Sequence, residues 1–472
     1  MGQSYFVGER KVRPGTYQRY EKTGANAVAG AVEHSVAIPV QSNWGPVGEV
    51  TEHRSVSSVK NTYGTAGTVD AAIALLEAGA PKIYVIRMGN ADESEATKAT
   101  YTLQNEGTDV LFVTAKHPGT KTIKVQTRVK TEGASKELIV YDGDTKAETF
   151  VFNAGSGVDE VANLIAAVAD SAYITVAKAE GASVTTVPVV TATALTGGVD
   201  PTVTTESYSK AFNRLEAYYF THVALDCVTQ EVQMLAKTWV ERVFDEGGRC
   251  QLILGGTNKT AFFAELISAG PALNNKQVIY SGIWGYDDNG NIVDGYKMAA
   301  YVAGAIASVP SNQTIVHKTV PGIVKIVPHT NAEYEAAIVA GVLLASYSPS
   351  GAIWFDSGIN TLTTLGENED EGWKKIRRVT TRFEQHKRID DALAPLVGNV
   401  NCDDDGVALA VQVGQGVLNA MIAEGKLKPG ATFFEDPENP REGDSAWFIV
   451  DAVDNDSLEK IYTCHRHRFT NA

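Results

Sequence analysis

Two patterns of apolar and polar residues alternate through the middle of the chain. Apolar runs of strand length alternate with segments in which apolar residues recur every three or four positions. Strands are predicted at residues 221–225, 251–254 and 277–281, and helices at residues 228–244, 259–269 and 297–307. The apolar face of the first helix consists of Val228, Val232, Leu235, Trp239 and Val243. This alternation predicts helices packed on a largely parallel sheet.

The same alternation is present before residue 92. The run Ala27–Pro39 has strand propensity, residues 69–77 have helical spacing, and residues 82–87 form a short apolar strand. We therefore expect residues 23–92 and 200–345 to form one discontinuous α/β domain.

The residue types and their spacing change between these two parts of the chain. Residues 93–199 are rich in Thr and alternate apolar with polar positions, as in residues 123–129, and one helix is predicted at residues 158–168. The glycine pair Gly197-Gly198 marks the return to the α/β pattern. Residues 93–199 are therefore predicted to be a separate β-rich insertion domain.

The last part of the chain mixes helical and strand patterns. A long helix is predicted to start near Trp373, and a second covers residues 406–424, with Asp404 or Asp405 as its N-cap. Strands are expected at residues 446–453 and 459–469. The run Ala336–Ala345, which precedes this part, is predicted to be a buried helix about half as long as a bilayer requires, so no membrane insertion is expected.

Together these patterns predict a multidomain α/β and α+β protein. An N-terminal arm of residues 1–22 joins an α/β middle domain that carries the β-rich insertion. Residues 346–472 form an α+β C-terminal core domain, which ends in a terminal strand arm of about residues 458–472.

The amino-acid composition argues against nucleic-acid-binding, disulfide-rich and zinc-ribbon proteins. The chain has 472 residues and a formal net charge of −15, so it lacks the excess of Lys and Arg that neutralises phosphates, and no nucleic-acid partner is expected. Its cysteines, Cys227, Cys250, Cys402 and Cys464, are far apart and suggest neither a disulfide framework nor a zinc ribbon.

Motifs for catalysis or cofactor binding are weak. The loop Gly255–Thr260 follows a predicted strand but lacks the spacing of a phosphate-binding P-loop. His465 and His467 share one face of a predicted strand and supply at most two ligands of a metal site, whereas a closed zinc site needs four. The run Asp403–Asp405 lacks the closing Glu of a calcium loop. We expect no catalytic residue, no metal and no cofactor.

Several stretches, taken in order, resemble the contractile phage tail sheath family in the form found in phages and prophages of Gram-positive bacteria. Pro14-Gly15-Thr16-Tyr17 is similar to the family's N-terminal Pro-Gly-x-Tyr, and Trp44-Gly45-Pro46 stands where an apolar strand ends in Gly-Pro. Residues 82–87, with Tyr84 and Arg87, are similar to the family's Tyr-Val-x-Arg strand.

The most specific resemblance lies toward the C-terminus. Ile359-Asn360-Thr361-Leu362-Thr363-Thr364 is followed by a segment of residues 374–379 that contains Arg377, then by residues 397–401 with Gly398 and Asn401, and finally by residues 459–462. Four such matches in the right order rank this family above an enzyme. We expect the matched residues to be core positions: Trp44, Gly45, Pro46, Tyr84, Arg87, Ile359, Asn360, Thr361, Leu362, Arg377, Gly398 and Asn401.

The resemblance implies a structural protein without a cofactor. Subunits would polymerise helically around the tail tube and contract to drive the tube through the host envelope for genome delivery. Both chain ends would add strands to a neighbour's sheet through Tyr5, Val7, Pro14, Gly15, Tyr17, Ile461, Tyr462, Thr463, His465, His467 and Phe469. The implied partners are further copies of the chain, the tail tube protein, and the baseplate and tail terminator proteins. The implied location is the virion tail, assembled in the host bacterial cytoplasm.

Two alternatives stay open at this point. One is the sheath of a phage-tail-like bacteriocin or injection machine, which the sequence does not separate from a phage sheath. The other is a cytosolic α/β nucleotide-binding enzyme that uses the loop Gly255–Thr260.

Overall fold

The computed structural model describes residues 3–4, 17–18, 32–89, 96–130, 135–181, 183–256 and 263–467. The chain divides into two compact units: the larger consists of residues 33–383 and 456–472, and the smaller consists of residues 1–32 and 384–455. The division falls inside helix α9 (Ile376–Leu393). The predicted C-terminal domain of residues 346–472 is therefore split, because Phe355 and Ile376 belong to the core of the larger unit.

A seven-stranded sheet in the order β18-β15-β14-β13-β3-β5-β4 forms the centre of the larger unit. All neighbouring strands are parallel except β4, which runs antiparallel to β5 at the edge. The prediction of a largely parallel sheet is confirmed. In chain order its strands are β3 (Val36–Val40), β4 (Val50–His53), β5 (Ile83–Arg87), β13 (His222–Ala224), β14 (Gln251–Gly255), β15 (Val278–Ser281) and β18 (Val342–Leu343).

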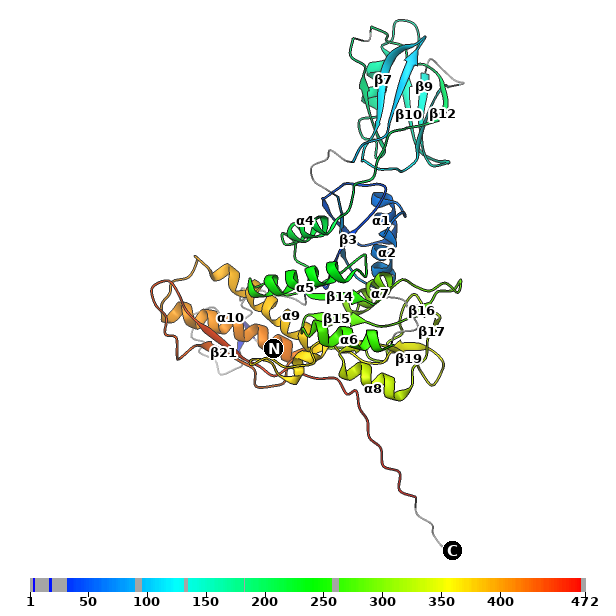
Figure 1. The fold of residues 1–472 in the computed structure, drawn as a ribbon. Coiled ribbons are helices and arrows are strands. Elements are labelled where there is room, and N and C mark those ends of the chain that lie inside the picture. The colour runs from blue at the N-terminus through cyan, green and yellow to red at the C-terminus, as the bar shows by residue number, and fades with distance from the viewer. Residues whose placement is uncertain are drawn as a thin grey trace. The chain divides into compact units, whose positions relative to one another are not determined.

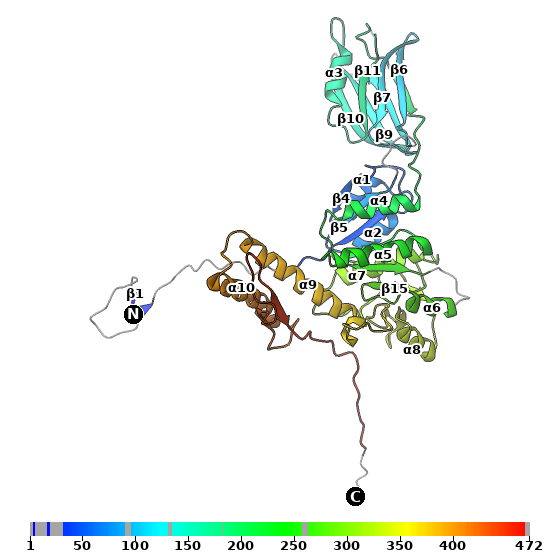
Figure 2. The ribbon, with the colours of Figure 1, turned by 60° about the vertical axis from the view of Figure 1, so that its left-hand side comes forward.

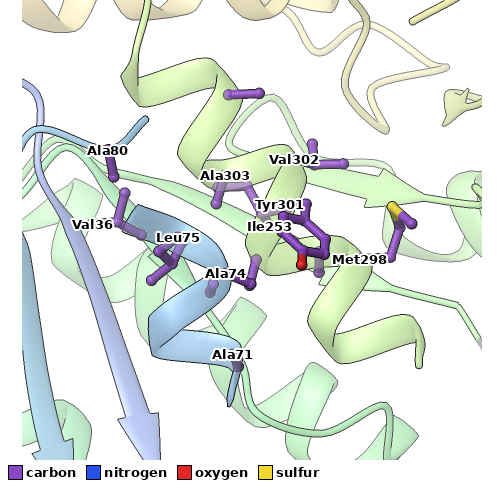
Figure 3. Packing of buried hydrophobic residues seen from close by; sticks show 14 of the residues in the cluster. Val36, Ala71, Ala74, Leu75, Ala80, Ile253, Met298, Tyr301, Val302 and Ala303 are labelled. Atoms are coloured by element: carbon purple, nitrogen blue, oxygen red, sulfur yellow. The ribbon is translucent and has the colours of Figure 1, made fainter. Parts of the chain in front are cut away.

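Helices α1 (Val56–Tyr63), α2 (Val69–Glu77) and α7 (Gly295–Ala307) cover one face of this sheet. Figure 3 shows side chains of α2, such as Leu75, and of α7, such as Tyr301, in one cluster with residues of β3 and β14. A Cβ atom at Gly304 would clash with the carbonyl of Leu75, so the glycine allows α2 and α7 to approach closely.

The opposite face is covered by α4 (Thr205–Leu215), α5 (Gln230–Asp245), α6 (Phe263–Leu273) and α8 (Asn331–Val339). The rings of Phe212 and Trp239 stack with their centroids 4.7 Å apart, which joins α4 to α5. Figure 1 shows α5 and α6 beside the strands that they cover.

The sequence predicted one buried helix for the apolar run Ala336–Ala345, and this prediction is wrong. Helix α8 ends at Val339, Gly341 has a left-handed backbone with φ of +70°, and the chain then enters β18. Because a periodicity argument cannot separate a helix from a strand in so short an apolar run, the glycine decides the boundary. Strands β19 (Ala345–Tyr347) and β20 (Ile353–Phe355) form a hairpin after it, and β16 (Gly285–Tyr286) pairs with β17 (Lys325–Ile326).

The inserted segment forms two sheets and a helix (Figure 2), and they enclose a hydrophobic core that also contains Trp44 from the turn after β3. One sheet has the order β10-β9-β8-β12 and the other β11-β7-β6, and all neighbours within them are antiparallel. The strands are β6 (Thr100–Asn105), β7 (Thr108–Ala115), β8 (Ile123–Val129), β9 (Ser135–Asp142), β10 (Thr145–Asn153), β11 (Ile174–Lys178) and β12 (Val190–Ala194), with helix α3 (Glu160–Ala167).

The smaller unit combines the second half of α9, the short helix η2 (Ala394–Leu396) and helix α10 (Asp404–Ala423) with a hairpin of β21 (Thr432–Glu435) and β22 (Phe448–Asp451). The N-cap of α10 is Asp403, which accepts from the main-chain N–H of Gly406, and not Asp404 or Asp405 as predicted. In the N-terminal segment, β1 (Gln3–Ser4) pairs in parallel with β2 (Tyr17–Gln18).

Helix α10 is long and apolar enough, by length and composition alone, to cross a membrane. Core helices of proteins without membrane spans meet the same criterion, so a single such helix is weak support for a span. Its side chains Val417, Leu418 and Met421 are buried in a cluster with Phe433.

The described end of the chain forms no strand. Residues 459–467, where a strand was predicted, have an extended trace without helix or strand (Figures 1 and 2). A strand needs a hydrogen-bonding neighbour, and this segment finds none among the described residues of its own chain.

Candidate functional sites

The motif of residues 359–362 anchors a loop to the start of β15. The Asn360 side-chain amide donates to the carbonyls of Lys276, at 2.7 Å, and Trp373, at 2.6 Å, and its Oδ1 accepts from the N–H of Leu362. The Thr361 N–H donates to the carbonyl of Val278, at 2.8 Å. Because these polar groups are buried and hydrogen-bonded, they fix the loop in one position.

The side chain of Thr361 completes this anchor. Its hydroxyl donates to the carbonyl of Asn275, at 3.0 Å, and lies 3.2 Å from the N–H of the same residue. Leu362 is buried next to it, and Ile359 forms an isolated bridge with Lys375. Through these contacts the four residues link the loop to the start of β15 and to Lys375.

A second group of motif residues lies where β5 ends. The fully buried Arg87 side chain donates from Nε to the carbonyl of Ser42, at 2.9 Å, and from Nη1 to the carbonyl of Gly45, at 2.7 Å. Burial lowers the pKa of Arg87 to about 10, so the guanidinium stays charged at neutral pH. Trp44 and Tyr84 are also buried, and Pro46 is half-buried after Gly45, whose φ is +101°.

The exposed C-terminal segment starts from a fixed point in the larger unit. Lys375 Nζ donates to Asp456 Oδ2, at 2.8 Å, and to Glu459 Oε2, at 3.1 Å. The largely buried Arg377 donates from Nη1 to Ser457 Oγ, at 3.0 Å. The hydrogen bond to Lys375 lowers the pKa of Asp456, and the carboxylates raise the pKa of Lys375.

We call these contacts of Lys375 and Arg377 with residues 456–459 the Lys375 anchor. Beyond it, five predicted arm residues are exposed: Ile461, Tyr462, Thr463, His465 and His467. The His465 and His467 rings lie parallel with centroids 6.5 Å apart, and no group of three or more metal-ligating side chains occurs among the described residues. Tyr17 is described only as part of strand β2. Four predicted N-terminal arm residues, Tyr5, Val7, Pro14 and Gly15, and the C-terminal Phe469 lie outside the described residues.

The matched residues of the smaller unit are exposed. Gly398 has a φ of +74°, which fits its place in a turn after η2. Asn401 precedes α10, where its carbonyl packs against Gly406 so closely that a Cβ atom there would clash.

A buried aspartate lies at the point of the sheet where many doubly wound proteins hold ligands. The chain order of the sheet reverses between β3 and β13, and Asp226 follows β13 at that point. Tyr208 donates to its Oδ1, at 2.6 Å, and Thr68 donates to its Oδ2, at 2.6 Å. Burial raises the pKa of Asp226. Asp226 is 1% exposed, so its carboxyl group is used in packing the end of β13 against Tyr208 and Thr68.

The glycine pair of the candidate phosphate loop also has a packing role. Gly255 is the last residue of β14, and a Cβ atom on it would clash with the carbonyl of Gly295 at the start of α7. Gln233 donates to the Gly255 carbonyl at 2.8 Å. Residues 257–260, the rest of that loop, lie outside the described part of the chain.

Sequence reasoning missed the partners that complete these sites. Lys375 lies in a matched segment, but its partner Asp456 is 81 residues away, and only the folded chain brings them together. The basic pair Lys374-Lys375 beside a buried helix start was the available signal.

Comparison with known proteins identifies this architecture. Residues 202–361 match the family model described as the phage tail sheath protein central domain. The chain is 24% identical over 394 residues to the uncharacterized protein YqbK of Bacillus subtilis (strain 168), covering 80% of this chain and 79% of that protein. It is 27% identical over 173 residues to the tail sheath protein of Clostridium phage phiCD119, covering 36% and 43% of the two chains.

Solved structures share the fold. The sheath tail protein Lin1278 of Listeria innocua superposes with a TM-score of 0.68 at 19% identity, covering 91% of this chain and 97% of that one. The helical sheath of the anti-feeding prophage in its contracted state superposes with a TM-score of 0.53 at 10% identity, covering 97% and 99% of the two chains.

Proposed function

We propose that the chain is a contractile tail sheath protein, the subunit that polymerises around a tail tube and contracts to drive the tube through a host envelope for genome delivery. The matched family is structural. The buried motif residues support that role, because they hold loops and strands together.

The main support for this proposal is that the C-terminal segment beyond the Lys375 anchor is exposed and unpaired among the described residues. The side chains of Leu458, Ile461 and Tyr462 are 81%, 74% and 89% exposed, among the highest values for large apolar residues in the described chain. Within residues 458–467 no main-chain group bonds to another main-chain group of the described chain. An extended segment with free N–H and C=O groups and exposed apolar side chains has the form of a strand that completes a neighbour's sheet.

The anchor makes this segment usable in an assembly. Lys375 and Arg377 hold residues 456–459 against the larger unit, so every copy presents the segment from the same place. At about 3.3 Å per extended residue, residues 458–467 reach roughly 30 Å, which is far enough to contact an adjacent subunit.

One such contact, repeated, produces a filament. A segment donated to a different surface of the next copy is a heterologous contact, and heterologous contacts that do not close a ring give an open helix. The tip carries His465, Arg466 and His467, whereas the whole chain has a net charge of −15. Complementary charge of this kind sets registry and encounter rate more than affinity.

The remaining partners follow from the same proposal. We infer contacts with the tail tube, baseplate and tail terminator proteins, assembly in the host bacterial cytoplasm, and a place in the virion tail, without a cofactor or nucleic acid. The likeness to an anti-feeding prophage sheath supports a second candidate, the sheath of a phage-tail-like bacteriocin or injection machine. Particles that carry a DNA-filled head would identify the phage form.

Strand donation can be tested by one substitution in the arm. Ile461→Pro removes a main-chain N–H and blocks strand pairing, while Ile461→Val keeps both the N–H and the strand propensity. We expect both variants to fold with the wild-type urea midpoint. In negative-stain electron microscopy, Ile461→Val should form hollow tubes and Ile461→Pro should not. Tubes of normal width from Ile461→Pro, and from a chain ending at Ser457, would contradict the donated-strand proposal.

A further inference from the structure

Arg87 connects the α/β domain to a loop inside the insertion and to Asp200, the residue that follows the insertion. Besides its bonds to the turn after β3, Nη1 donates to the carbonyl of Pro118, at 2.8 Å, in the loop that joins β7 to β8. Nη2 lies 3.6 Å from Oδ1 of Asp200, the residue at which the insertion returns to the α/β domain. One side chain therefore contacts three segments that are distant in the sequence.

The same segments are tied to one another around the guanidinium. Asp200 accepts from the N–H of Thr120, at 2.9 Å, and from its hydroxyl, at 2.7 Å. The N–H of Lys121 donates to the carbonyl of Asn43, at 3.3 Å. Gly119 packs on the Asn43 carbonyl so closely that a Cβ atom would clash with it.

A tryptophan makes the apolar part of this junction. Trp44 belongs to the turn after β3, yet its ring is buried in the core of the insertion. It lies edge-on to His117, at 5.1 Å between ring centroids, and stacks with Tyr173 at 6.0 Å. Lys121 Nζ lies 5.4 Å from the centroids of both the Trp44 and Tyr173 rings.

We infer that Arg87 is the positioning residue that fastens the insertion to the α/β domain, so that the two behave as one body. A further consequence for motion rests on the proposed sheath function. If the chain forms a sheath, the insertion would follow each rotation of its subunit and would not move independently. Any molecule bound to the insertion would then move with the sheath lattice.

The geometry requires arginine. The guanidinium is planar and presents donors in several fixed directions, which is how one side chain reaches the carbonyls of Ser42, Gly45 and Pro118 together. A lysine ammonium is a single point charge at the end of a flexible chain and cannot span these three acceptors.

Hydrogen–deuterium exchange of the full-length, unassembled chain tests this inference without depending on sheath formation. For Arg87→Lys we expect main-chain exchange in residues 42–48 and 116–121 to rise at least about tenfold, because the local bonds open more often. Exchange in strands β8 and β9, inside the insertion, should stay within a factor of about two.

Thr120→Val is a milder companion variant, because it removes only the hydroxyl bond to Asp200, and it should raise exchange in the same two segments by a smaller factor. Arg128→Lys is the matched control, since Arg128 pairs with Glu137 within the insertion, and it should leave the junction unchanged. Unchanged junction exchange in Arg87→Lys, or an equal rise across the whole α/β sheet in both junction variants, would overturn the inference.

Discussion

The side-chain amide of Asn360 donates to the main-chain carbonyl of Lys276 at 2.7 Å, across 84 residues of sequence. The contact ties the loop after β20 to the loop before β15, and a second bond from the same amide reaches Trp373. A single buried side chain thus fixes the route by which the chain leaves the sheet and enters α9.

Replacing Asn360 by Ala should destabilise the larger unit. The change leaves the buried Leu362 N–H and two part-buried carbonyls without their partner, and an unsatisfied buried group costs about 1–3 kcal/mol. We expect the free energy of unfolding in urea to fall by roughly 2–4 kcal/mol. Asn368→Ala, at an exposed position nearby, should change it by less than about 0.5 kcal/mol. Equal effects of the two substitutions would show that the Asn360 bonds do not stabilise the fold.

Lys375→Met should separate folding from assembly. Lys375 bonds Asp456 and Glu459 at the base of the C-terminal segment, and partly exposed ion pairs contribute only about 0–1 kcal/mol to stability. The urea midpoint should therefore hardly change, while sedimentation should show a critical concentration for assembly several-fold higher than that of the wild type. The control Lys374→Met removes only a local pair with Glu371. A normal critical concentration for Lys375→Met would mean that the anchor is dispensable.

Buried histidines should make the folded chain sensitive to mild acid. Burial lowers the pKa of His222 to about 3, whereas an unfolded histidine titrates near pH 6.5. Below about pH 6.5 the unfolded state therefore binds more protons than the folded state, and stability decreases as the pH falls. For one such group the loss is about 2 kcal/mol at pH 5.

His222→Gln should flatten this dependence, because glutamine does not titrate. The measurement is the difference in unfolding free energy between pH 7 and pH 5, for the wild type, for His222→Gln and for the exposed control His467→Gln. A wild-type pH slope in His222→Gln would assign the acid sensitivity to other groups, such as His117, whose pKa burial lowers to about 4.

Gly414→Ala should weaken the smaller unit although alanine favours helices. An exposed Gly→Ala change inside a helix gains about 1 kcal/mol, but a Cβ atom here would lie 2.5 Å from the Phe433 ring. Overpacking of this kind costs about 1–3 kcal/mol, so we expect a net loss of stability and faster amide exchange in α10. Ala408→Ser, on the exposed side of the same helix, is the control. A more stable Gly414→Ala protein would mean that the ring moves away at little cost.

Much of the fold could be predicted because the burial of one face of a helix or strand sets the spacing of its apolar residues along the sequence. The helix predicted at residues 69–77 coincides with α2, and the strand predicted at residues 123–129 coincides with β8. In both elements the buried side chains repeat at the period of the element itself. The mixed α/β and α+β class and the parallel sheet were predicted correctly for the same reason.

The errors have different causes. The strand expected at residues 459–469 has no partner among the described residues of its own chain. The N-cap of α10 could not be chosen among three consecutive aspartates, Asp403 to Asp405, because each can accept the same bond. Motif order pointed to Arg87 and Asn360, but only the structure shows which carbonyls they bind.

Donation of the terminal segment between neighbouring copies can be seen in an electron cryomicroscopy map of the assembled tube. We expect continuous density from the Lys375 anchor of one subunit through residues 458–467, hydrogen-bonded as a strand to a sheet of the next subunit. A map in which residues 458–467 fold back on their own subunit, with no main-chain bond to a neighbour, would contradict it.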